Sequence, residues 1–295
     1  MKKIFVPGKL ILTGEHSVVY GYPALVASID KGVSVTIKKG LGKVDLGKEE
    51  DPIGLVKKAV DVSGLDGSEV DIKIESGLPV ASGLGSSAAV SAGVIKAVYD
   101  FLGKDLKEND WYELTMECER LAHENPSGVD PAAVIYGGLM KYIKGKGIER
   151  LVIAKPLSLL LFQSGRPRES TRDMVIEVVG KRMKREPKVD EGIFKKIGIV
   201  TEKIQKVLER RNGVGELFDE NGKLLENLGV VGGKVRKISA ELRKLDCGVK
   251  VTGAGGVTGG SGMMMVYHTD LDIPEKYLKE EGYKYMKVTV GEKSS

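Results

Sequence analysis

A glycine-rich segment at residues 79–90 constrains the fold of this chain more than any other stretch. It has the sequence PVASGLGSSAAV and leads directly into apolar residues that recur at helical spacing, among them Val94, Ile95 and Val98. A flexible linker would not continue this way, so the segment predicts a glycine loop that opens a helix over 86–102. A helix start offers unpaired N–H groups and a positive dipole end. The loop therefore predicts an anion site, with close packing at a helix entry as the alternative.

Composition narrows the class of protein. The chain has 295 residues, 41% hydrophobic and 29% charged, which is typical of a folded protein with one large domain or two ordinary ones. Its net charge of +5 comes from 46 basic and 41 acidic residues that are mostly interleaved, so we expect no nucleic-acid surface. No apolar run approaches the roughly 18 residues of a membrane span. The sequence predicts neither nucleic acid nor membrane as a partner.

Two cysteines, Cys118 and Cys247, lack the spacing of a metal site. Two reduced thiols are the simpler interpretation, with a single disulfide as the alternative. The start MKKIFVPGK has a glycine where a signal peptide would continue its apolar core. We therefore expect a cytoplasmic location.

The periodicity of the chain predicts a strand-rich first part with two helices and, after about residue 155, a helix-rich second part with a few strands. Strands are expected at 33–37, 70–74, 157–165, 247–267 (two strands around a glycine turn) and 283–290, a hairpin at 40–47, and helices at 86–102, 108–123, 170–179, 192–210 and 232–245. The second helix should bury a stripe formed by Trp111, Leu114, Cys118 and Leu121. Ser170 and Asp173 have the spacing of a capping box. We predict domains at 1–154 and 155–295.

Three further segments carry side chains suited to chemistry. PGKLILTGEHSVVYG (7–21) holds a lysine, a Glu–His pair and a serine, ECERLAHENPSGVDPA (117–132) holds Glu119 and Asp130, and VTGAGGVTGGSG (251–262) is a second glycine loop. Two carboxylates this close could serve a metal and a proton. Taken singly, the first segment is equally compatible with an exposed turn and the last with a hairpin, whereas isolated carboxylates such as those of the second usually belong to a solvated acidic helix end.

Together the four segments resemble the GHMP small-molecule kinases, because PGKLILTGEHSVVYG, GLGSSAA, PSGVDPA and TGAGG occur in that order. The first segment and HENPSGVD are most similar to the mevalonate kinases of that family, and SGRPREST (164–171) resembles their substrate-side loop. The resemblance implies a two-domain α+β fold. A domain like ribosomal protein S5 domain 2 would hold ATP, a ferredoxin-like C-terminal domain would face it, and the site would lie in the cleft between them.

The resemblance also implies roles for individual residues, with ATP and Mg²⁺ as cofactors. Asp130 would accept the proton of the attacking hydroxyl, and Lys9 would sit beside it. The ATP phosphates would be bound by Gly83, Leu84, Gly85, Ser86 and Ser87, and by Gly253, Ala254 and Gly255. Ser87 and Glu119 would hold Mg²⁺. The hydroxy-acid substrate would be bound by Glu15, His16, Ser17 and Thr171.

Two positions depart from the family pattern. Glu124 stands where the family usually has glycine, and a glutamate does not readily adopt a positive φ. The glycine turn GAGGVTGGSG is longer than the usual one by Val257 and Thr258, which leaves its contacts with phosphate open.

The reaction that the resemblance implies is ATP-dependent phosphorylation of mevalonate on its 5-hydroxyl. The alternatives are a sister kinase, acting on phosphomevalonate, on another hydroxyl of mevalonate or on a sugar, and a non-catalytic relative that senses a ligand. Retention of Lys9, Ser87, Glu119 and Asp130 argues against the last. The sequence allows a homodimer without specifying one.

Overall fold

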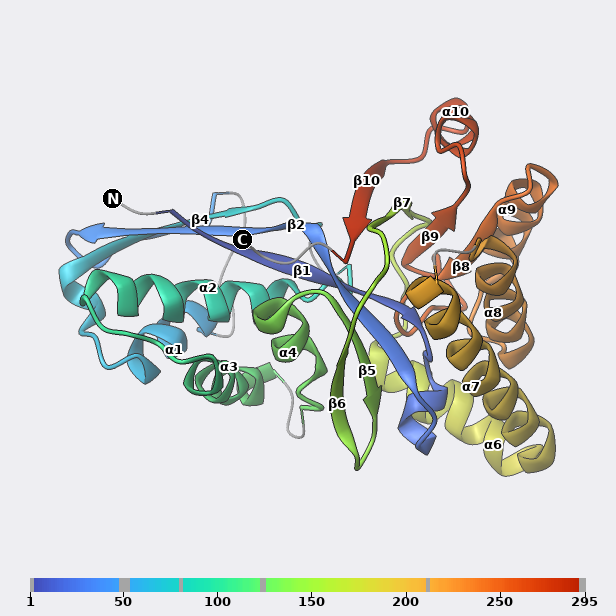
Figure 1. Ribbon diagram of the computed structural model, residues 1–295, viewed down its shortest axis with the longest axis horizontal. Coiled ribbons are helices and arrows are strands. Elements are labelled where there is room, and N and C mark those ends of the chain that lie inside the picture. The colour runs from blue at the N-terminus through green and yellow to red at the C-terminus, as the bar shows by residue number, and fades with distance from the viewer. Residues whose placement is uncertain (1–2, 48–53, 80–81, 123–125, 211–212, 292–295) are drawn as a thin grey trace. The chain divides into compact units, whose positions relative to one another are not determined.

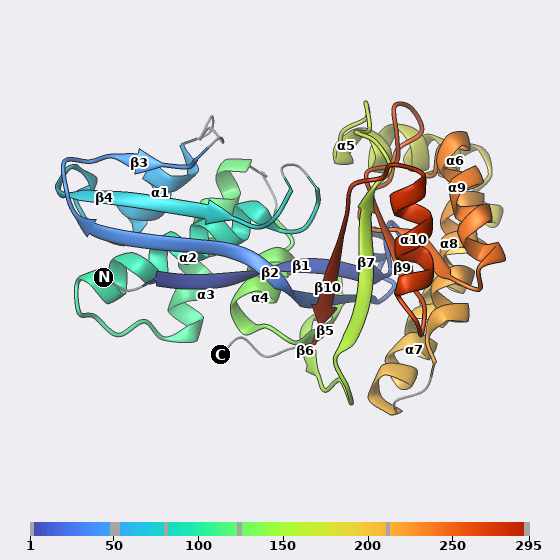
Figure 2. The same cartoon turned by 90° about the horizontal axis from the view of Figure 1, so that it is seen from above.

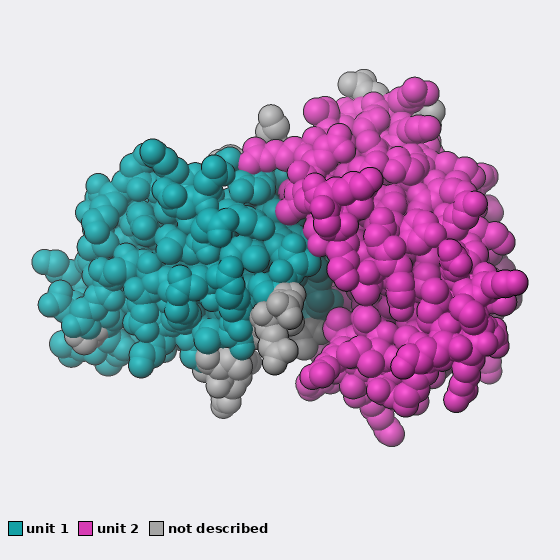
Figure 3. Space-filling view, turned by 90° about the horizontal axis from the view of Figure 1, so that it is seen from below, with its two compact units in different colours: residues 1–10, 28–138, 292–295 teal, residues 11–27, 139–291 magenta. Residues whose placement is uncertain are grey.

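The computed structural model describes residues 3–47, 54–79, 82–122, 126–210 and 213–291 (Figure 1). The chain divides into two compact units, coloured separately in Figure 3. Unit 1 comprises residues 1–10, 28–138 and 292–295, and unit 2 comprises residues 11–27 and 139–291. The units interleave along the chain, and the domain division at residue 155 stays a prediction.

The sheet of unit 1 is built on a long strand. β2 (Ala24–Lys39) pairs with β1 (Lys3–Thr13) and, antiparallel, with β4 (Val70–Ser76), while the short β3 (Val44–Asp45) pairs parallel with β4. The predicted alternation in β2 is confirmed, because Val33, Val35 and Ile37 are buried. The hairpin predicted at 40–47 is wrong. β3 pairs with β4 rather than folding back on β2, a choice that depends on a strand distant in sequence.

Helices cover one face of this sheet (Figure 1). They are α1 (Leu55–Val62), the 3-10 turn η2 (Gly67–Glu69), α2 (Ser86–Phe101), α3 (Glu108–Ala122) and α4 (Val129–Tyr136). α2 follows the glycine loop as predicted, and Gly93 allows it to lie close to β2, since a Cβ there would be 2.7 Å from Val35. The stripe predicted for α3 is partly wrong. Leu121 is 46% exposed, whereas Thr115, Cys118 and Glu119 are buried.

Unit 2 contains a second set of antiparallel strands, seen from above in Figure 2. β10 (Tyr285–Val290) pairs with β7 (Leu157–Gln163), which pairs with β9 (Met263–Tyr267), which pairs with β8 (Gly248–Val251). β5 (Leu139–Ile143) pairs with residues 24–27 of β2 and with β6 (Gly147–Leu151). The predicted strands at 157–165, 247–267 and 283–290 are thereby confirmed.

Unit 2 also contains helices, of which α8 and α9 pack against β8 and α10 contacts β7 (Figure 1). They are η1 (Ser17–Tyr20), α5 (Thr171–Asp173), the π-helical η3 (Met174–Gly180), α6 (Lys181–Arg185), α7 (Pro187–Arg210), α8 (Gly215–Leu228), α9 (Gly233–Lys244) and α10 (Asp272–Glu280). The capping box of Ser170 and Asp173 is confirmed. Across the described ranges, no helix combines the length and the apolar character needed to cross a bilayer.

Candidate active site

The glycine loop of unit 1 presents the start of α2. Gly83 and Gly85 have φ of +73° and +72°, the left-handed region that favours glycine. Gly85 is the N-cap of α2, and Ser86 and Ser87 form its first turn. Because the first N–H groups of a helix lack intrahelical partners, this end of α2 is suited to an anion.

Lys9 lies directly against this loop. Its backbone N–H donates to the carbonyl of Leu84 at 2.9 Å. A Cβ on Gly85 would be 2.7 Å from Cγ of Lys9, so only glycine leaves room for the lysine stem at this point. Lys9 is 5% exposed. The close approach ties the position of the ammonium group to the conformation of the loop.

Asp130 lies in the first turn of α4, after the left-handed Gly128. Its Oδ1 is 3.0 Å from Nζ of Lys9, and its side chain is 37% exposed. The predicted proximity of these two residues is confirmed. Tyr112 explains the glycine at 128, since a Cβ there would be 2.2 Å from the tyrosine hydroxyl. The turn thus places a solvent-accessible carboxylate next to a buried cation.

The two residues expected to hold a metal lie on neighbouring helices. Ser87 is on α2, and its buried Oγ has no hydrogen-bond partner among the described residues. Glu119 is on α3 and is 4% exposed. Beside it, burial raises the pKa of the Cys118 thiol to about 11. In the part of the chain that the structure describes, no group of three or more His, Cys, Asp or Glu side chains could hold a metal ion.

In unit 2 the Glu–His–Ser segment forms a tight turn between β1 and η1. His16 has φ of +60°, an uncommon conformation for a residue other than glycine. Ser17 is fully buried and its hydroxyl donates to the carbonyl of Gly14 at 3.2 Å. Glu15 is 3% exposed, and its carboxylate accepts a hydrogen bond from the ammonium of Lys250. The turn is therefore held from both sides by buried polar contacts.

His16 has a defined protonation state. Its Nε2 lies 2.9 Å from the carbonyl oxygen of Ala254. Since a carbonyl only accepts, Nε2 carries the proton and donates. Burial lowers the pKa of His16 to about 4, with the Ala254 hydrogen bond opposing the shift. The ring is therefore neutral near pH 7. Its buried Nδ1 has no partner among the residues described, which leaves it able to accept a hydrogen bond.

The second glycine loop follows β8. Gly253 and Gly255 have φ of +87° and +73°, and a Cβ on Gly255 would be 2.2 Å from the carbonyl oxygen of Val230. Val257 and Thr258, the additional residues of this loop, both form hydrogen bonds with Glu169. Glu169 accepts hydrogen bonds from the N–H groups of Val257 and Thr258 and, at 2.7 Å, from the Thr258 hydroxyl. The longer loop is thus attached to the 164–171 segment.

Thr171 is the first residue of α5 and is exposed. Its exposed position contrasts with the burial of Glu15, His16 and Ser17. The structure thus brings together Lys9, Gly85 and Asp130 in unit 1, and the 14–17 turn with residues 250–254 in unit 2. Glu124, where the sequence departs from the family pattern, falls outside the described residues.

Sequence reasoning missed two residues of this region, Lys250 and Glu169. A signal existed for Lys250, because it interrupts the apolar strand Val249–Val251 immediately before the glycine loop. Glu169 had no such signal, because its partners are backbone N–H groups of a loop 88 and 89 residues away.

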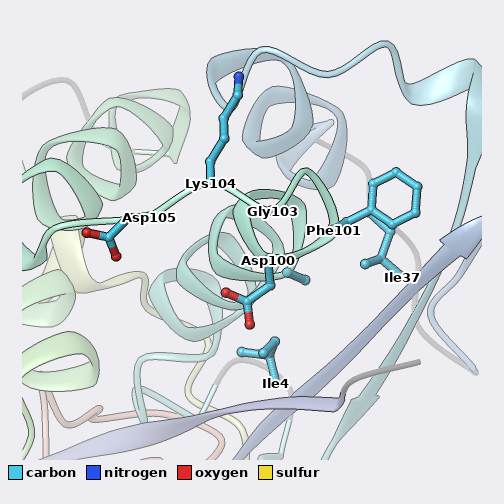
Figure 4. A pocket seen from close by; sticks show the side chains of 8 residues that line it. Ile4, Ile37, Asp100, Phe101, Gly103, Lys104 and Asp105 are labelled. Carbon is cyan, nitrogen blue, oxygen red and sulfur yellow. The ribbon is translucent and has the colours of Figure 1, made fainter.

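A surface cavity of about 500 Å³ lies elsewhere in unit 1, at the C-terminal end of α2 (Figure 4). Its lining includes Ile4, Ile37, Asp100, Phe101, Lys104 and Asp105. None of the residues predicted for the site lies in this lining.

Comparison with known proteins gives consistent matches. Residues 54–138 match the family model described as the GHMP kinases N-terminal domain. The mevalonate kinase of Thermococcus onnurineus is 33% identical over 288 residues, covering 85% of each chain. That of Archaeoglobus fulgidus is 31% identical over 260 residues, covering 85% of this chain and 88% of the relative.

Solved structures agree in fold. The Methanococcus jannaschii mevalonate kinase has a TM-score of 0.81 at 23% identity and covers 98% of both chains. The L. major mevalonate kinase in complex with R-mevalonate has a TM-score of 0.86 at 23% identity, covering 100% of this chain and 97% of that one.

Proposed function

The chain belongs to the GHMP kinase family, and we propose that it transfers the γ-phosphoryl group of ATP to the 5-hydroxyl of mevalonate. The predicted α+β GHMP kinase fold is confirmed by the solved structures. The assignment to mevalonate is supported by the relatives, which are mevalonate kinases at 31–33% identity over 85% of this chain.

The observation that carries the proposal is the contact between Lys9 and Asp130 beside the glycine loop. Phosphoryl transfer requires alignment, neutralisation of charge and an acceptor for the hydroxyl proton. In this proposal the Asp130 carboxylate accepts the proton of the 5-hydroxyl while the oxygen of that hydroxyl forms a bond to the γ-phosphorus. The bond to ADP breaks in the same displacement. Lys9 keeps the carboxylate in place and favours the negative charge that develops on the attacking oxygen.

The nucleotide phosphates are assigned to the loop formed by Gly83, Leu84, Gly85, Ser86 and Ser87. Backbone N–H groups at the start of α2 supply donors, and the left-handed glycines allow close approach. Gly253, Ala254 and Gly255 are proposed as further contacts to the nucleotide. Their loop has two left-handed glycines and a partly exposed backbone, which suits such a contact.

Mg²⁺ fits the residues present. The buried hydroxyl of Ser87, which has no partner among the described residues, and the buried carboxylate of Glu119 are oxygen ligands of the kind that Mg²⁺ prefers. Mg²⁺ commonly takes one or two side chains and completes its shell with phosphate oxygens and water. When bound, it would neutralise charge on the transferred phosphoryl group.

The substrate is assigned to Glu15, His16, Ser17 and Thr171. A neutral His16 that donates through Nε2 leaves Nδ1 to accept from a hydroxyl group. Mevalonate carries two hydroxyls that could make this hydrogen bond.

A homodimeric state and a cytoplasmic location stay predictions.

The test is a substrate panel. ADP release is measured by a coupled assay with mevalonate, phosphomevalonate, galactose and homoserine, and the product is located by phosphorus NMR. We expect mevalonate to be turned over far better than the others, with phosphate on the terminal hydroxyl. Faster turnover of another member, or phosphate on the tertiary hydroxyl, would overturn the assignment.

A further inference from the structure

Lys250 is a lysine with no access to solvent. It lies in β8 between Val249 and Val251, and its side chain is 0% exposed. Its ammonium group donates to the carboxylate of Glu15, whose side chain is 1% exposed. On the other side it packs against α8, where a Cβ on Gly222 would be 3.3 Å from Cβ of Lys250. The pair is thus enclosed within unit 2.

Stability alone does not account for such a pair. Taking two charges out of water is costly, and apolar residues of similar volume are often as stabilising or more so. Burial lowers the pKa of Lys250 and the Glu15 carboxylate opposes that shift, so the ammonium depends on its partner. We therefore look for the role of the Glu15–Lys250 ion pair in the geometry of the two segments that it joins.

The pair holds a turn that is strained and tightly packed. His16 has φ of +60°, a conformation that persists when the surroundings impose it. Two further contacts join the same segments. The Thr252 hydroxyl donates to the carbonyl of Ile11 at 3.0 Å, and Nε2 of His16 donates to the carbonyl of Ala254 at 2.9 Å. Residues 11–16 are therefore fastened to residues 250–254 at three points.

We propose that Lys250 is a positioning residue for substrate binding, which acts through Glu15 to hold the 14–17 turn in its binding conformation. The inference rests on the proposed substrate role of Glu15, His16 and Ser17. The side chains of Lys250 and Glu15 are 0% and 1% exposed, so the pair would act on substrate binding through the position of the 14–17 turn. Its effect should therefore appear in the binding of mevalonate rather than in that of ATP.

The test compares Lys250→Met, Glu15→Gln and the double variant. Loss of either partner leaves the same turn unsupported, so each single change should raise the KM for mevalonate roughly tenfold or more, with the KM for ATP unchanged. The double variant should raise it no further than the worse single one, because both act through one contact. It buries no unpaired charge, so its melting temperature should recover towards that of the unmodified chain.

Arg243→Met provides the matched control. Arg243 also forms ion pairs within unit 2, with Asp219 and Glu226, and its partly buried side chain is 17% exposed. Its loss should lower the melting temperature but leave the KM for mevalonate unchanged. If Lys250→Met does not fold, Lys250→Arg, which keeps the charge but not the length of the side chain, replaces it and should also raise the KM for mevalonate. A KM for mevalonate equal to that of the unmodified chain in the double variant would overturn the proposal.

Two other results would also overturn it. One is that the effects of Lys250→Met and Glu15→Gln on the KM for mevalonate add up in the double variant. The other is that Arg243→Met raises this KM as much as Lys250→Met does. Failure of the proposed function has a different signature. In that case the unmodified chain itself releases no ADP with mevalonate. The positioning proposal is contradicted only when the unmodified chain is active with mevalonate and the variants give one of the contradicting results above.

Discussion

Nζ of Lys9 and Oδ1 of Asp130 are 3.0 Å apart, and they differ sharply in access to solvent. The lysine side chain is 6% exposed and that of the aspartate 37%. The cation is thus fixed by β1 and the glycine loop, while the carboxylate stays within reach of a ligand. This arrangement suits a base that is oriented by a buried partner.

Asp130→Asn tests the base. The amide keeps the shape of the side chain but does not accept the hydroxyl proton, so we expect kcat to fall by roughly 10²–10⁴-fold. The KM for ATP should change little, because the phosphates are assigned to the glycine loop. Steady-state kinetics with both substrates provide the measurement. Asp100→Asn is the control, since Asp100 pairs with Lys96 at a distance from this contact. A kcat near normal in a folded Asp130→Asn protein would contradict the assignment.

The two glycines of the loop should respond differently to alanine. The Cβ of Gly83→Ala would meet no atom within 4 Å, so this change adds only the cost of a left-handed backbone, about 1–2 kcal/mol. Gly85→Ala adds the same strain and also brings a Cβ to 2.7 Å from the Lys9 stem. We expect kcat to fall by roughly tenfold more in Gly85→Ala. Equal kinetic effects, at comparable melting temperatures, would show that the loop does not set the position of Lys9.

Glu119→Gln tests the metal assignment. Replacing a carboxylate oxygen by an amide weakens a hard-cation ligand, so a higher Mg²⁺ concentration should be needed for half-maximal rate. Glu117→Gln is the matched control two residues earlier on α3, where the side chain is 45% exposed and pairs with Lys58. A Mg²⁺ titration that is the same for both variants and the unmodified chain would return Glu119 to a structural role.

His16 should make stability depend on pH. Its folded-state pKa of about 4 lies below the ordinary 6.5. Between these values the unfolded chain binds the proton more readily, so the contribution of His16 is present above pH 6.5 and is lost as the pH falls towards 4. The loss amounts to at most about 3 kcal/mol.

His16→Asn isolates this contribution, because asparagine tolerates positive φ but does not titrate in this range. Unfolding is followed by calorimetry between pH 7 and pH 4, in steps of about half a pH unit. The variant should lose less stability than the unmodified chain across that window. If the free energy of unfolding falls equally with pH in His16→Asn and in the unmodified chain, this would contradict the buried, neutral state of the ring.

The sequence by itself determined the features that depend on neighbouring residues. The glycine loop before α2, the capping box of Ser170 and Asp173 and the alternation in β2 were all predicted correctly. Each follows from backbone conformation, a local hydrogen bond or the period of a strand. The four-segment resemblance also predicted that Lys9 and Asp130 would lie close together, as they do.

Only the tertiary structure decided the contacts that join distant segments. The pairing of β3 with β4, the exposure of Leu121 and the attachment of Thr258 to Glu169 depend on which elements pack together. The ion pair of Glu15 and Lys250 is the clearest case, because 235 residues separate its partners. A local pattern carries no information about such a pair. Its two charges are stable in the interior only where folding brings them into contact.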